Sequence, residues 1–172
     1  MNFTLKSILA GSALVAISFG ATSAQAATNS ATANANATII SALTITKNND
    51  LNFGTAVPAA TAGTVVIAPT AAGTQVCTTV VCTGAGNSAA QFTLSGAATY
   101  TAVVTIPATV SLAGPGPSMT ATLSNSLTAN KMLLTGTAAD NFYVGGSLAV
   151  GTSALQTSGA YTGTFTVTVA YQ

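Results

Sequence analysis

The C-terminal stretch from Gly159 to Gln172, GAYTGTFTVTVAYQ, constrains the fold more than any other part of the chain. Phe165, Val167, Val169 and Tyr171 recur at every second position, and threonines and one alanine stand between them. Successive side chains of a strand point to opposite faces, so a period of two is typical of a half-buried β-strand. The sequence therefore predicts a terminal strand with one apolar and one hydroxyl-bearing face.

The first 26 residues have the three ordered features of a secretory signal peptide. Lys6 supplies the positive charge, Ile8 to Phe19 form a short apolar run, and Ala24-Gln25-Ala26 is a small-x-small cleavage site. The apolar run is too short to span a bilayer. We expect export and a mature chain that begins at Ala27 and has no transmembrane segment.

Charged side chains are scarce after this segment and are limited to Lys47, Asp50, Lys131 and Asp140. The chain contains no His, Glu, Arg or Trp. A nucleic-acid partner is excluded because no basic patch exists to neutralise phosphates. The usual residues for acid–base catalysis and for metal ligation are missing too, so we expect no enzyme, no cofactor and no metal site.

Cys77 and Cys82 are the only cysteines of the chain. An exported protein enters an oxidising compartment, so a disulfide between them is the default expectation. The closed loop is short, and the chain-entropy contribution is about 2 kcal/mol. This pair is expected to join a turn or two adjacent strands.

Many short β-branched runs alternate with glycine and proline turns through the rest of the chain. Their spacing of about 8–12 residues is typical of an antiparallel β-sandwich, with a closed barrel as the alternative. No helical periodicity is present. Turns are expected at Lys47–Asp50 and at Gly145-Gly146, the latter separating a strand at 142–144 from one at 147–150.

Alternation also marks the region from Ala27 to Thr46. Residues 27–38 are predicted to form an N-terminal extension, and Ile39 to Thr46 the first strand of a body that covers residues 39–172. The odd positions of the extension present small apolar side chains in a row: Ala31, Ala33, Ala35, Ala37 and then Ile39.

Three phrases together resemble a bacterial pilin-like family, the domain of unknown function 4402. They are LNFG at 51–54, YVGG at 143–146 and the terminal GAYTGTFTVTVAYQ, in this order. That family is in turn similar to the major subunits of chaperone–usher fimbriae. The terminal phrase adds a glycine at position 159 and a tyrosine next to last, which resembles the C-terminal signature of these pilins.

The resemblance implies an immunoglobulin-like β-sandwich that is incomplete because its last strand is missing. The gap would leave an apolar groove that an extended N-terminal donor strand of the next subunit fills by β-strand addition. It implies a structural fibre subunit that supports adhesion, lies at the cell surface in a fimbria, and is partnered by other pilin subunits, a periplasmic chaperone and an outer-membrane usher. The donor residues would be Ala31, Ala33, Ala35, Ala37 and Ile39. The strand beside the groove, which the chaperone grips, would hold Gly159, Phe165, Val167, Val169 and Tyr171.

Small donor side chains set this sequence apart from better-known pilins. Four alanine methyls give roughly 3 kcal/mol at about 0.8 kcal/mol each. The inserted segment is therefore either the alanine row in a shallow groove or a shifted one that includes Ile39, Ile40 and Leu43. The alternative function is a self-contained secreted adhesin or glycan-binding module, whose N-terminal segment would pair within its own sheet.

Overall fold

The computed structural model describes residues 28–137 and 139–172, and the expected signal peptide lies outside these ranges. The chain divides into two units, one ending at Ala37 and the other covering Thr38–Gln172. Residues 28–43 have no helix or strand. Among the described residues, no helical segment has the length and apolarity that a membrane span requires.

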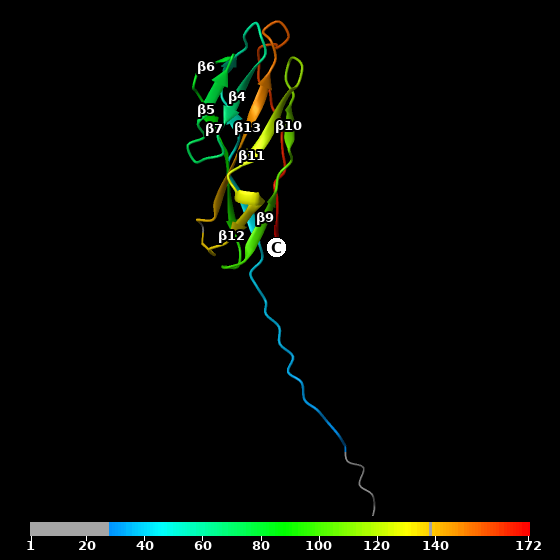
Figure 1. The fold of residues 1–172 in the computed structure, drawn as a ribbon. Coiled ribbons are helices and arrows are strands. Elements are labelled where there is room, and N and C mark those ends of the chain that lie inside the picture. The colour runs from blue at the N-terminus through cyan, green and yellow to red at the C-terminus, as the bar shows by residue number, and fades with distance from the viewer. Residues whose placement is uncertain (1–27, 138) are drawn as a thin grey trace, which may run out of the picture. The chain divides into compact units, whose positions relative to one another are not determined.

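Strands dominate the second unit, and the only helical element of the described ranges is one 3-10 turn, η1 (Thr128–Asn130). The prediction of an all-β antiparallel sandwich-like fold is confirmed (Figure 1). The strands are β1 (Thr44–Asn49), β2 (Asn52–Phe53), β3 (Ala56–Val57), β4 (Gly63–Ile67), β5 (Gln75–Thr78), β6 (Val81–Cys82), β7 (Asn87–Ser88), β8 (Ala90–Ser95), β9 (Thr101–Thr105), β10 (Thr109–Leu112), β11 (Met119–Asn125), β12 (Lys131–Leu133), β13 (Asn141–Val150) and β14 (Thr168–Tyr171).

The larger sheet is built around the long strand β13. One side of β13 pairs with β11, and β10 follows as the next strand outward. The other side pairs first with β8, which carries β1, and then with β4, which carries β5. All of these pairs are antiparallel, so one strand of ten residues organises both ends of the sheet.

The expected turn at Gly145-Gly146 is wrong, because β13 continues through both glycines. The strand changes partners at this point, from Val144 opposite Ala90 in β8 to Gly146 opposite Ile67 in β4. A Cβ on Gly145 would meet the carbonyl oxygen of Ile67, and one on Gly146 would lie 2.6 Å from the carbonyl oxygen of Thr122. The glycines therefore permit close backbone approach rather than a turn.

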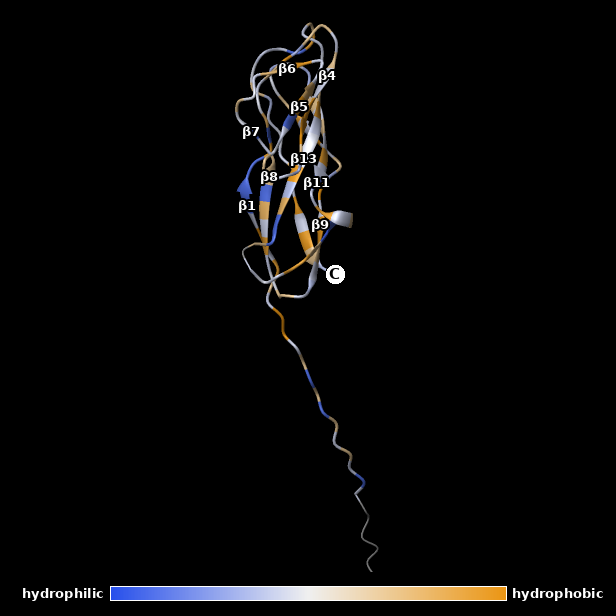
Figure 2. Cartoon of the chain, turned by 60° about the vertical axis from the view of Figure 1, so that its left-hand side comes forward, coloured by the Kyte–Doolittle hydropathy of each residue, from blue (hydrophilic) through white to orange (hydrophobic). Residues whose placement is uncertain are grey.

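The first strand begins and ends later than the sequence predicts. β1 starts at Thr44, not Ile39, because β8 ends at Ser95 opposite it. It then continues to Asn49 through a bulge between Lys47 and Asn49, where a turn was expected. The side chain of Asn48 donates to the hydroxyl of Thr93 at 2.6 Å, so the turn-forming amides serve as links to β8. Figure 2 shows the hydrophilic colour of this end of β1.

The smaller sheet has the order β12-β9-β14. β14 pairs with β9 from Thr168 opposite Thr105 to Tyr171 opposite Ala102. The terminal segment is also joined to the end of β10 by a bridge between Ala113 and Thr162. It thus lies beside both β9 and β10, as the red segment in Figure 1 shows. Only its last part is a regular strand, because the pairing is interrupted between residues 162 and 168.

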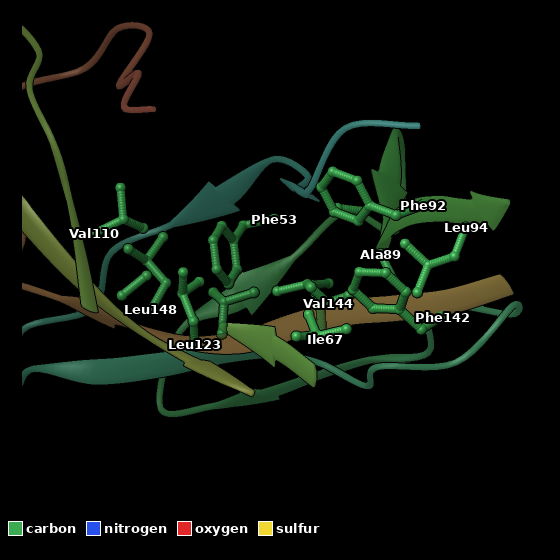
Figure 3. Close-up of a cluster of buried hydrophobic side chains, with 14 of the residues drawn as sticks. Phe53, Ile67, Ala89, Phe92, Leu94, Val110, Leu123, Phe142, Val144 and Leu148 are labelled. Carbon is green, nitrogen blue, oxygen red and sulfur yellow. The ribbon is translucent and has the colours of Figure 1, made fainter. Parts of the chain in front are cut away.

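One apolar core joins the two sheets. Figure 3 shows it extending from Leu94 and Phe142 at one end to Val110 and Leu148 at the other. The rings of Phe92 and Phe142, directly opposite each other in β8 and β13, stack at a centroid distance of 5.3 Å. Ala102 and Val104 of β9 and Leu134 after β12 are the contribution of the smaller sheet.

We predict that Gly145→Ala destabilises the fold by roughly 1–3 kcal/mol, the usual cost of overpacking a filled site. The reason is the main-chain oxygen of Ile67, which cannot move aside as a side chain would. Gly151→Ala is the matched control, because a Cβ there meets only the end of the Gln156 side chain. Urea unfolding measures both, and equal midpoints for the two variants would contradict this explanation.

Candidate functional site

β1 and β14 are two of the strands that lie at sheet edges, as β5, β10 and β12 also do. Within the described residues, β1 pairs only with β8, and β14 pairs only with β9. The hydrogen-bonding groups on the other side of each strand therefore have no sheet neighbour. Such edges are the places where another chain can add a strand.

A cavity of about 670 Å³ opens between the continuation of β1 and the segment that precedes β14, and we call it the edge groove. Residues 51–56 and Pro58 form one wall, and residues 156–163 with Phe165 form the other. Core side chains form the floor: Val65, Val110, Leu112, Met119, Leu148 and Val150. The walls also carry uncharged polar side chains, among them Asn52, Gln156 and Thr157, and no charged side chain lines the edge groove.

Beyond the edge groove, the apolar side chains of both edge strands are only half-buried. This holds for Ile45 of β1 and for Val167, Val169 and Tyr171 of the terminal segment, although all pack against the core. The intervening residues 164, 166, 168 and 170 are exposed, as the alternation predicted. We call this row of partly exposed apolar side chains along the two edges the strip.

The hydroxyl of Tyr171 joins the two edges at one end of this strip. It donates to the carbonyl oxygen of Ser41 at 2.8 Å and accepts from the backbone N–H of Ala97 at 2.7 Å. Ser41 precedes β1, and Ala97 follows β8. Tyr171 thereby closes the end of the strip that lies opposite to the edge groove.

The hydroxyl of Tyr161 holds the other end of the terminal segment. It accepts from the N–H of Gly116 at 3.1 Å and donates to the carbonyl oxygen of Thr157 at 2.8 Å. Gly159 has a φ of 147°, and the ring of Pro115 fills the space that a Cβ at Gly159 would occupy. The segment is thus attached at both ends, and the wall it forms does not need a further strand to stay in place.

The predicted groove residues Gly159, Phe165, Val167, Val169 and Tyr171 all lie on this segment, and Gly159 and Phe165 line the edge groove itself. The predicted donor residues Ala31, Ala33, Ala35, Ala37 and Ile39 are exposed, and Ile39 is 95% accessible. Their assignment as donors stays a prediction.

The predicted disulfide between Cys77 and Cys82 is present, with a Cα separation of 6.2 Å. Cys82 lies opposite Ala56 in the β3–β6 pair, and Ala56 lines the edge groove. The disulfide therefore stabilises the β3–β6 pair, which contributes Ala56 to the wall of the edge groove. It is a structural staple, as the sequence indicated.

The sequence did not predict that residues 51–58 form a wall of the edge groove, or that the hydroxyl of Tyr161 holds one end of the terminal segment. The LNFG phrase carried the signal, because Asn52 accepts from the N–H of Gly54 at 2.8 Å and Gly54 has a φ of 73°. An asparagine two residues before a glycine is typical of such a side-chain turn. This turn redirects the chain directly after β2, whose second residue, Phe53, is buried in the core.

Three of the four charged side chains of the body, Lys47, Asp50 and Asp140, have structural partners. Lys47 pairs with Asp50 at 2.5 Å on the surface. The buried carboxylate of Asp140 accepts from the N–H of Thr135 and from its hydroxyl, the latter at 2.7 Å. In the part of the chain that the structure describes, no three His, Cys, Asp or Glu side chains gather as a metal site.

These features define an all-β sandwich-like protein with open sheet edges beside a groove that has an apolar floor and no charged lining. Residues 43–171 match the family described as "Domain of unknown function (DUF4402)", and the chain belongs to this family. No curated protein and no solved structure matches it. The match contains the first two phrases that carried the resemblance and all of the terminal phrase except its last residue, Gln172.

We predict that Tyr171→Phe lowers the free energy of unfolding by about 1–2 kcal/mol, because two hydrogen bonds are lost while the ring stays. Amide hydrogen exchange should rise at Ala97. Tyr143→Phe is the control, since its hydroxyl makes no hydrogen bond to the described residues. If both variants unfold alike, the hydroxyl of Tyr171 does not hold the edges together.

Proposed function

We propose that this chain is a structural subunit of a bacterial surface fibre, assembled when the N-terminal arm of one copy fills the edge groove of the next. The arm is residues 27–43. The observation that carries the proposal is the pair of open edges, β1 and β14, with the edge groove and its apolar floor between their extensions. An added strand would satisfy backbone groups on both edges at once.

The arm has the chemistry that the edge groove requires. No charged residue occurs between Ala27 and Thr46, and apolar side chains occupy every second position from Ala31 to Ile39. Residues 28–43 contain no strand of their own, and apart from the carbonyl group of Ser41, which accepts from Tyr171, their backbone groups have no sheet partner among the described residues. An uncharged, alternating segment without a sheet partner fits a groove that has no charged lining.

The same open edges need protection before assembly. An exposed edge with half-buried apolar side chains is a site of uncontrolled pairing. In our proposal a periplasmic chaperone adds a strand beside Phe165–Tyr171 during export, and an outer-membrane usher exchanges it for the arm of the next copy. The immunoglobulin-like topology and the cell-surface location belong to this proposal as well.

Two defective variants test it through complementation. A chain without residues 27–38 keeps the edge groove but has lost the alanine row of the arm, and Val167→Lys keeps the arm but places a charge on the half-buried edge face. We expect each to fail to form fibres alone. Mixed together they should form dimers and no longer chains, as measured by size-exclusion chromatography with light scattering.

Thr166→Lys is the matched control for the charged variant, because Thr166 is exposed on the outer face. It should assemble like the unsubstituted chain. Fibres made by the chain without residues 27–38 would refute the proposal. If the unsubstituted chain is a stable monomer that never assembles, the alternative of a self-contained secreted adhesin or glycan-binding module takes its place.

A further inference from the structure

We infer that Ile39 of a second copy occupies the wide end of the edge groove, with the inserted arm antiparallel to the terminal segment and Ala37 opposite Phe165. This inference rests on the proposed function and specifies its orientation and register. It also decides between the two segments, alanine row or shifted segment, that the sequence leaves open. The inserted face is the alanine row with Ile39 at its end, and it includes neither Ile40 nor Leu43.

The sizes of the facing side chains on the arm and on the terminal segment favour this register. The cavity lies at the Tyr161–Phe165 end, and none of residues 166–171 lines it. Gly163 stands in its wall without a side chain, and a Cβ there would meet the main chain of Ser111, so the position stays small. In the inferred register each large side chain faces a small one. The pairs are Ile39–Gly163, Ala37–Phe165, Ala35–Val167, Ala33–Val169 and Ala31–Tyr171.

The polar face of the arm fits the same register. Directly opposite residues of an antiparallel pair lie on the same face of the sheet. The second set of pairs is Thr38–Thr164, Asn36–Thr166, Asn34–Thr168 and Thr32–Ala170. The terminal-segment members of these pairs are exposed. Uncharged polar side chains thus meet on the outer surface, where they can form cross-strand hydrogen bonds.

The backbone of the terminal segment also fits. Thr162 exchanges both of its hydrogen bonds with Ala113, and Gln172 donates to the carbonyl oxygen of Thr101. Backbone groups of alternate residues point to opposite sides of a strand. The N–H and C=O groups of the odd residues, from Gly163 to Tyr171, therefore point to the open side. In the inferred register these are the residues directly opposite the odd, apolar residues of the arm.

Reach excludes the chain's own Ile39 from this position. Five residues separate Ile39 from Thr44, a span of at most about 18 Å. The wall of the edge groove at Asn52 lies eight residues beyond Thr44 along an edge that tracks β8 and β7, roughly 25 Å away. If the arm folded back beside its own β1, it would run parallel to β14. Ile39 would then lie near Tyr171, at the end of the terminal segment away from the edge groove.

Cysteine pairs in the full chain test orientation and register. Ala37→Cys with Phe165→Cys places two thiols directly opposite across the inferred interface, within the Cα range of a disulfide. Ala37→Cys with Val169→Cys is the control, because those positions would be four residues apart. After mild oxidation of the assembled protein, a non-reducing gel should show a ladder of covalent multimers from the first pair only.

Other outcomes have distinct meanings. A ladder from the control pair alone overturns the register, while fibre formation keeps the proposed function intact. Monomers with an internal crosslink show that the arm fills its own sheet and overturn the inference. If the unsubstituted chain forms no fibre, the proposed function itself fails and the inference with it.

A second measurement tests the anchor. Ile39→Ala should raise the dissociation rate of the arm on the order of 30-fold, since removing a buried isoleucine side chain costs at least about 2 kcal/mol. Ile40→Ala is the matched control, because Ile40 would point to the opposite face of the inserted strand. Equal disassembly rates for the two variants, followed by light scattering in urea, would overturn the placement of Ile39.

Discussion

Unpaired backbone groups along two sheet edges are the constraint on which the rest of this structure depends. A buried N–H or C=O must have a hydrogen-bond partner, and an exposed edge offers its groups to any passing strand. Here both edges lie beside apolar side chains that the core covers only in part. Adding one strand would satisfy the backbone and cover the side chains together. This coupling is the physical basis of the strand addition that we propose.

Interactions elsewhere in the fold hold the walls of the edge groove in place. β8, β4 and β11 all pair with β13, and the glycines at 145 and 146 let β13 change partners without a break in the strand. Tyr161 and Tyr171 attach the terminal segment at its two ends by their hydroxyls. The disulfide at Cys77 and Cys82 supports the wall at Ala56. The groove therefore exists as a defined shape before anything enters it, which lowers the ordering cost of binding.

Local patterns sufficed to predict the strands, because the period of two is a property of each strand alone. The half-buried face from Phe165 to Tyr171 and the disulfide follow from the sequence. Positions that depend on neighbours were harder. Gly145 and Gly146 resemble a turn until the close approach of Ile67 is known, and Asn48 resembles a turn until its bond to Thr93 is seen. The wall at 51–58 could not be predicted, because its place beside residues 156–165 is set by pairing with β6 and β7.

The scarcity of charge gives the open edges their significance. Natural edge strands are commonly protected by charged side chains, above all lysine. β14 and the segment before it carry no charge, and the single lysine of β1 is paired with Asp50 at the strand's far end. The arm is equally free of charge from Ala27 to Thr46. A chain under selection to remain a lone monomer would gain from one charge on either edge, at little cost to the core. Neither β14, nor the segment before it, nor the arm carries such a charge, so no charged side chain on them would have to be desolvated in the strand addition that we propose.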